Sequence, residues 1–64
     1  MEIILGAFVS PDGRWRVQAV RKGDHSWYRI LRDGQTFADG LLRREAERVL
    51  RNDAGLHLAD LVED

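Results

Sequence analysis

Residues 14–32 read RWRVQAVRKGDHSWYRILR, and this stretch decides the fold. Polar or charged residues alternate with aliphatic and aromatic residues in two runs, which the segment KGDH at 22–25 separates. Alternation with a period of two is typical of β-strands, and a short polar segment with glycine between two such runs indicates a hairpin. We therefore predict antiparallel strands at 14–21 and 26–32.

One further strand is predicted on each side of this hairpin. The segment IILGAFV at 3–9 is rich in β-forming residues, and the turn-forming sequence SPDG follows it at 10–13. The dipeptide DG at 33–34 indicates another tight turn, which leads into a short strand at 35–38. The four strands at 3–9, 14–21, 26–32 and 35–38 are predicted to form an antiparallel meander.

After the meander the apolar spacing becomes that of a helix. The apolar positions fall at i, i+4, i+7 and i+8 and form one stripe: Leu42, Ala46, Val49 and Leu50. We predict a helix at 40–52, with Asp39 as its N-cap and Gly55 as its stop. Residues 56–62 fit either a short strand or one helical turn, and we favour the turn. The predicted fold class is α+β: a three- to four-stranded antiparallel meander, one amphipathic helix on one face and a short C-terminal element, in a single domain at 1–64.

Alternation assigns each strand residue to one of two sheet faces, and directly paired residues share a face. A four-residue loop at 22–25 pairs Trp15, Val17 and Ala19 with Arg32, Ile30 and Tyr28, and a three-residue loop at 11–13 pairs Val9 with Trp15. The larger apolar set is expected to form the core under the helix: Ile3, Leu5, Ala7, Val9, Trp15, Val17, Ala19, Tyr28 and Ile30. The opposite face is unusually apolar and basic for a face that meets solvent: Ile4, Phe8, Arg16, Gln18, Val20, Trp27, Arg29 and Leu31.

The composition of the 64 residues limits the classes of function. The net charge is −1, but all ten basic residues lie within 14–51, whereas 52–64 contains four acidic residues and no basic one. Because cysteine is absent and the two histidines have no ligand spacing, we predict no disulfide, no metal site and no cofactor. No apolar run is long enough to span a membrane, which favours a soluble, cytoplasmic protein.

Catalysis has little support in the sequence. The hydroxyl groups of Ser10, Ser26, Thr36 and Tyr28 lie in no nucleophile elbow and beside no candidate base. Phosphate-binding and metalloprotease motifs are also absent. We therefore predict a small non-enzymatic binding module that uses the outward sheet face.

Nucleic acid is one predicted ligand of this module. Arginines on a sheet can contact base edges and phosphates, aromatic side chains can stack on bases, and Arg44, Arg48 and Arg51 add a basic stripe along the helix. Trp15, Trp27, Phe37 and EAERVL at 45–50 are arranged in an order that resembles, in architecture, the sheet-plus-helix DNA-binding modules of phage-type integrases and of a class of plant transcription factors. That resemblance implies DNA binding, and we predict an accessory or regulatory DNA-binding role.

Protein association is the alternative prediction. Arginine, tryptophan and phenylalanine are also enriched at protein interfaces, and a chain of this size gains core by pairing. We expect a homodimer at micromolar or higher concentration, or a contact with another protein. The predicted contact residues for nucleic acid or a partner are Phe8, Arg16, Gln18, Trp27, Arg29 and Leu31 on the sheet and Arg44, Arg48 and Arg51 on the helix.

Overall fold

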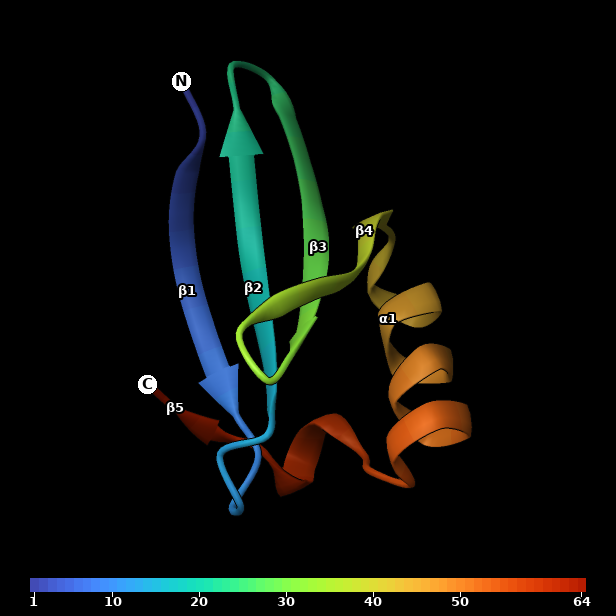
Figure 1. Ribbon diagram of the computed structural model, residues 1–64. Helices are drawn as coiled ribbons and strands as arrows, with labels where there is room; N and C mark the ends of the chain where they lie inside the picture. Colours follow the sequence, from blue (N-terminus) through green and yellow to red (C-terminus); the bar gives the residue numbers. More distant parts are fainter.

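The computed structural model describes residues 1–64 as one antiparallel sheet with a helix on one of its faces (Figure 1). The strands are β1 (Ile3–Val9), β2 (Trp15–Lys22), β3 (His25–Arg32), β4 (Gln35–Leu41) and β5 (Val62–Glu63), and their order in the sheet is β4-β3-β2-β1-β5. The helical segments are α1 (Arg43–Val49), a π-helical continuation of it (Leu50–Ala54) and a 3-10 turn (Leu58–Asp60). The predicted α+β meander is confirmed, and β5 adds a short fifth strand.

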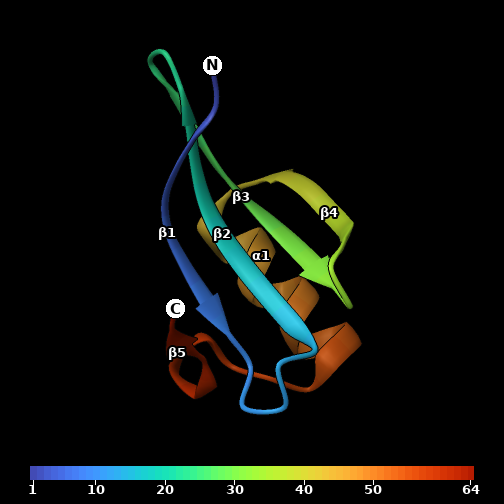
Figure 2. The same ribbon diagram turned by 60° about the vertical axis from the view of Figure 1, so that its left-hand side comes forward.

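The central hairpin has the predicted register. Trp15, Val17 and Ala19 of β2 pair with Arg32, Ile30 and Tyr28 of β3, so these residues share the face that α1 covers. In Figure 2, α1 lies behind the sheet, and no layer lies in front of it. We call the covered side the helix-side face and the other side the outer face.

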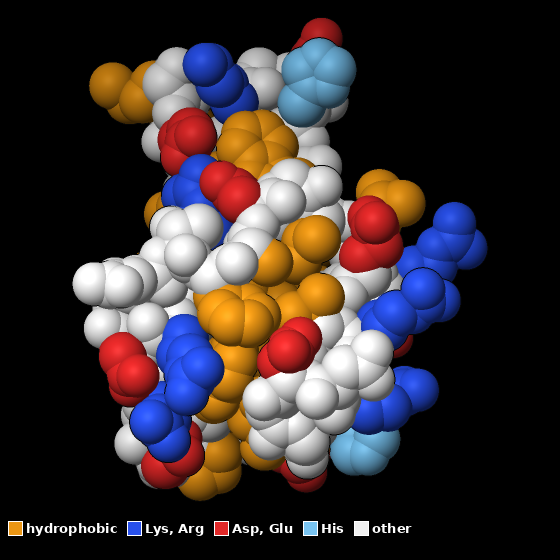
Figure 3. Space-filling view, turned by 45° about the vertical axis from the view of Figure 1, so that its right-hand side comes forward, with side chains coloured by type: hydrophobic (Ala, Val, Ile, Leu, Met, Phe, Trp, Pro, Cys, Tyr) orange, Lys and Arg blue, Asp and Glu red, His pale blue; other side chains and the backbone are white.

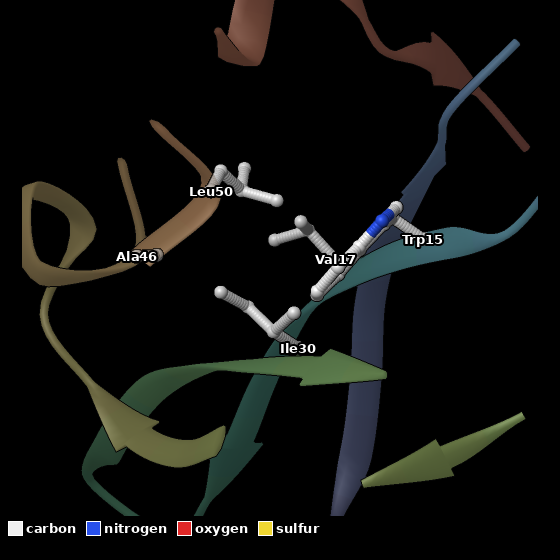
Figure 4. Close-up of a cluster of buried hydrophobic side chains, with 5 residues drawn as sticks. All are labelled: Trp15, Val17, Ile30, Ala46 and Leu50. Atoms are coloured by element: carbon white, nitrogen blue, oxygen red, sulfur yellow. The ribbon is translucent and has the colours of Figure 1, made fainter. Parts of the chain in front are cut away.

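A small apolar core joins the sheet to the helix. Trp15, Val17 and Ile30 point from the sheet toward Ala46 and Leu50 of the helix (Figure 4). The Phe37 and Trp15 rings form a T-shaped pair with a centroid distance of 5.1 Å, and the Arg32 guanidinium lies 5.5 Å from the Trp15 centroid. The core is narrower than predicted because Ile3, Leu5 and Leu42 remain exposed.

The predicted three-residue turn between β1 and β2 is wrong. Ser10 pairs with Trp15 instead: the Ser10 N–H donates to the Trp15 carbonyl at 2.8 Å, and the Ser10 hydroxyl accepts from the Trp15 N–H at 3.0 Å. The same hydroxyl donates to Asp12 at 2.5 Å, and the Asp12 carboxylate accepts from the Arg14 N–H at 3.0 Å. These side-chain bonds close a four-residue loop, because short polar side chains in turns compete for nearby backbone groups.

The longer loop moves β1 by one residue against β2. Val9 pairs with Arg16, and Phe8 pairs with Val17, so Phe8 lies on the helix-side face and not on the outer face as predicted. Ala7 and Val9 correspondingly move from the predicted core to the outer face. A bulge at Leu5, between Ile4 and Gly6, then restores the predicted assignment of Ile4 to the outer face, opposite Val20.

The junction of β4 and α1 also differs from the prediction. β4 extends to Leu41 through two irregularities in its pairing with β3, one of them near Gly40, whose φ of +67° suits glycine. The helix begins at Arg43 and not at residue 40, and its N-cap is Leu42 and not Asp39. The Leu42 N–H donates to the Glu45 carboxylate at 2.8 Å, which replaces the missing side-chain cap.

The C-terminal segment contains both of the elements considered for it. The helix ends before Gly55 as predicted, and Gly55 itself has a left-handed backbone conformation with φ of +67°. The favoured helical turn is present as the 3-10 turn, and β5 follows it and pairs Val62 with Val9 at the edge of β1. No helix in the structure has the length and apolar character needed to cross a lipid bilayer.

Candidate binding surfaces

The outer face brings most of the predicted sheet residues together. Arg16 pairs with Leu31, and Gln18 pairs with Arg29, while Trp27 lies opposite Val20. Val20 is completely buried although no second layer covers this face, so the larger side chains around it close over it. The five predicted residues are each partly buried: Arg16, Gln18, Trp27, Arg29 and Leu31.

The arginines of the outer face are paired with carboxylates of the same chain. The Arg29 guanidinium contacts the Glu2 carboxylate at 2.9 Å and the Asp39 carboxylate at 3.1 Å, and only 16% of the Arg29 side chain is exposed. The hydrogen bond to Glu2 raises the pKa of Arg29, so this group stays charged. Arg16 forms an ion pair with Asp64, which follows β5. A phosphate would have to displace these carboxylates before it could contact either arginine.

Asp39 is the residue that organises the outer face near β4. Its carboxylate accepts hydrogen bonds from the Trp27 indole N–H and the Gly40 N–H, both at 2.8 Å. Partial burial alone would raise the pKa of Asp39, but the Gly40 N–H and the contacts with Arg29 and Trp27 outweigh it and lower that pKa. Asp39 therefore holds Trp27 and Arg29 in place as an anion.

The basic stripe of the helix lies on a different surface from the outer face. Arg44, Arg48 and Arg51 are exposed on the helix, which packs on the opposite side of the sheet, and no carboxylate lies within 4.0 Å of them. Arg43 differs because it pairs with Glu47 at 3.4 Å. The nine predicted contact residues are therefore divided over separate surfaces and do not form one site.

Phe8 belongs to a third surface, which the sequence did not predict. A hollow of about 400 Å³ beside Phe8 is lined by Val17, Tyr28 and Leu58. An adjoining hollow of about 170 Å³ shares Tyr28 and Arg43 with the first one. Together they form an apolar trough on the helix-side face, between β1 and the start of α1, which we define by Leu5, Phe8, Ala19, Tyr28, Leu41, Leu42 and Leu58.

Exposed apolar side chains also occur at the edge where β4 meets α1. In Figure 3, hydrophobic side chains run in a band down the middle of this side, with basic side chains on both flanks. Phe37 of β4 is 42% exposed although its ring packs against Trp15. The protein thus exposes apolar surface along more than one boundary of its core.

Sequence reasoning missed the carboxylates that pair with the outer-face arginines. Glu2 precedes Ile4 by two residues, so alternation alone places it on the outer face beside Arg29. The position of Asp39 depends on the irregular pairing of β4, and that of Asp64 depends on β5 returning to β1. Only the first of these three contacts had a signal in the sequence.

Comparisons with protein-family models, with curated proteins and with solved structures found no match to this chain.

Proposed function

We propose that this chain is a small non-enzymatic binding module that binds a segment of another protein in the apolar trough. The observation that carries this proposal is the incomplete cover of the helix-side face. α1 packs mainly on β3 and β4, so Leu5 and Leu42 stay 56% and 57% exposed on either side of a hollow lined by Tyr28. A concave apolar surface of this kind is typical of a site for a small amphipathic segment.

The rim of the trough adds an electrostatic preference. Arg43 lines both hollows, and the unpaired Arg44 and Arg48 border a separate hollow that shares Leu42 with the trough. The segment that fits is therefore apolar on one side and carries acidic residues toward α1. The apolar contact supplies most of the affinity, whereas the arginines orient the segment and increase its association rate.

A selection of random peptides tests this proposal, with two matched variants. Leu42 in the trough and Val62 on β5 are both 57% exposed, so Leu42→Gln and Val62→Gln each replace an aliphatic side chain of the same fractional exposure, in different places. We expect peptides selected on the wild type to be amphipathic and acidic. They should bind Leu42→Gln about tenfold more weakly, which is ~1.4 kcal/mol, and Val62→Gln with unchanged affinity. Failure to recover such peptides, or equal loss in both variants, would contradict the proposal.

Nucleic-acid binding remains a second candidate function, and the free arginines of the helix favour it. Because Arg16 and Arg29 are paired, this function would use Arg44, Arg48 and Arg51 on phosphates. Its affinity for random duplex DNA would fall with salt at a log–log slope of about −0.9 per phosphate contacted, or about −3 for three contacts. The double substitution R44Q/R48Q would abolish it, whereas Arg29→Gln would not. Titration by fluorescence anisotropy at low salt measures both effects.

A further inference from the structure

The outer edge of β1 is open along half of its length. β5 pairs with β1 only at Phe8 and Val9, and the Asp64 N–H donates to the Ala7 carbonyl at 2.9 Å, so Ile3 to Gly6 have no strand on the side away from β2. Figure 1 shows the same arrangement, with β5 beside only the lower end of β1. An unpaired strand edge is a template for another strand.

Apart from the bulge at Leu5, the usual protections of a strand edge are missing here. Exposed edges normally carry lysine, proline or an unpaired charge. The open part of β1 is IILG, in which Ile3, Ile4 and Leu5 are 47%, 45% and 56% exposed. The nearest charge is Glu2, and its carboxylate is held on the outer face by Arg29 at 2.9 Å.

The register shows which backbone groups face this edge. Lys22 pairs with His25 across a two-residue turn, so these two residues exchange backbone hydrogen bonds. Every second residue of β2, counted back from Lys22, bonds to β3 in the same way, and Val20 is one of them. A β2 residue that bonds to β3 faces away from β1. Ile4 lies opposite Val20, and its own N–H and C=O therefore point away from β2 toward the open edge.

We propose that this edge binds the same edge of a second copy of the chain, in an antiparallel register centred on Ile4. The two Ile4 residues then exchange N–H to C=O bonds across a two-fold axis, which makes the contact self-complementary. In this register Ile4 meets its symmetry mate on the outer face, and Ile3 meets Leu5 of the second copy on the helix-side face. The paired segment is 3–5, because Gly6 lies opposite Ala19 beyond the bulge and its backbone groups point toward β2. Ala7 therefore keeps its bond to Asp64, and β5 stays in place.

A second copy is the occupant that the surface favours. The accessible surface is 4521 Å², whereas a compact monomer of 7.4 kDa exposes about 4,200 Å². Pairing covers the three aliphatic side chains on both copies at once, and a net charge of −1 opposes it little. The contact buries less area than a standard interface of about 1,600 Å², so the dimer is weak and reversible. This inference does not rest on the proposed function, because the backbone groups of Ile4 carry the contact; Leu5 is the one side chain that belongs both to this contact and to the trough.

Sedimentation velocity and one pair of variants test the contact. We expect a monomer–dimer equilibrium between about 10 µM and 1 mM, as for a small interface. Ile4→Pro removes the N–H that faces the edge and leaves the β1–β2 ladder intact, since proline is tolerated where its nitrogen faces outward. It should raise the dissociation constant at least tenfold, whereas the control Ile4→Val should leave it within twofold. Circular dichroism shows whether both variants remain folded.

Hydrogen exchange of the wild type gives a second measurement, which does not depend on any variant folding. Protection of the Ile4 amide should increase with protein concentration. A monomer at every concentration with an unprotected Ile4 amide would overturn the proposal. A dimer that survives Ile4→Pro but is lost in Leu42→Gln would also overturn it and would place the interface in the trough. Protection of Ile4 by a selected peptide, but not by concentration, would assign the edge to another protein.

Discussion

The two edges of the sheet show opposite ways of ending a small sheet. β4 is irregular, with two departures from regular pairing, and Asp39 fixes it to Trp27 and Arg29 while α1 packs against it. β1 is regular apart from the bulge at Leu5 and has no cover over its first half. Charges and a packed helix protect the β4 edge, whereas the first half of β1 carries exposed aliphatic side chains and no cover.

The two halves of the molecule differ in how much they stabilise the fold and in how much apolar surface they expose. The buried side chains belong mostly to β2, β3 and the helix, whereas β1 contributes none of the fully buried large ones. Burial of apolar area is the main stabilising term, so the β2–β3–helix half holds the fold together. The β1 half contains Ile3, Ile4 and Leu5, whose apolar surface stays available for a partner. Variants that act on one half and not on the other test this division.

The largest expected effect comes from shortening one side chain to alanine in each half and comparing the two variants. Ile30→Ala removes a completely buried side chain next to Leu50 and should lower the free energy of unfolding by about 3 kcal/mol. Leu5→Ala removes a side chain that is 56% exposed and should cost less than about 0.5 kcal/mol. Urea denaturation at a concentration where the protein is monomeric measures both values. Equal losses would show that the β1 half also carries stability.

A smaller effect is expected where the two halves are joined by the loop after β1. Ser10 is 3% exposed, and its hydroxyl is the acceptor for the buried Trp15 N–H at 3.0 Å. Ser10→Ala leaves that N–H without its partner and should cost about 1–2 kcal/mol. Ser26→Ala, at an exposed position of β3, is the matched control and should change stability by less than about 0.5 kcal/mol. A loss in Ser10→Ala no larger than that in the control would show that the loop does not need the hydroxyl.

The same loop explains how far the sequence predicts this molecule. Alternation in 14–32 predicts the register of β2 and β3, and the apolar spacing predicts Ala46 and Leu50 in the core, because these contacts follow from strand and helix geometry. The register of β1 follows from the loop after it: Ser10 bonds to Trp15 and not to Arg14, so Arg14 joins the turn, and this single-residue slip exchanges the two faces. Phe8 was therefore assigned to the wrong face, and the trough was not predicted.

The outer face was predicted correctly for β2 and β3, but its charge was not predicted. Arg16, Trp27 and Arg29 lie on it as alternation requires. Their neutralisation depends on Asp39 and Asp64, which reach the face through irregular pairing of β4 and through β5. Such contacts between distant segments have no periodic signal. A prediction of phosphate binding from arginine count alone therefore overstates the positive charge that this face presents.

The smallest expected effect is a pH-dependent loss of stability in Asp39→Asn, at the β4 edge of the sheet. Asp39→Asn keeps an oxygen acceptor for the Trp27 and Gly40 N–H groups and removes the charge that faces Arg29 at 3.1 Å. Because the Asp39 side chain is 44% exposed, solvent screening limits the loss to less than about 1 kcal/mol at pH 7.

The pH dependence of that loss follows from the direction of the pKa shift. Folding lowers the pKa of Asp39 from its ordinary value of 3.8, so its contribution is present above that value and is lost as the pH falls through the lower, folded-state pKa. The difference in unfolding free energy between wild type and Asp39→Asn should therefore be constant from pH 5 to 7 and disappear in stronger acid. Glu2→Gln removes the other carboxylate bonded to Arg29, next to the open edge, and should cost less because Glu2 makes this single side-chain contact. Urea titrations of the three proteins across this pH range measure the difference. A loss in Asp39→Asn that persists unchanged below the folded-state pKa would show that Asp39 acts through its shape and not through its charge.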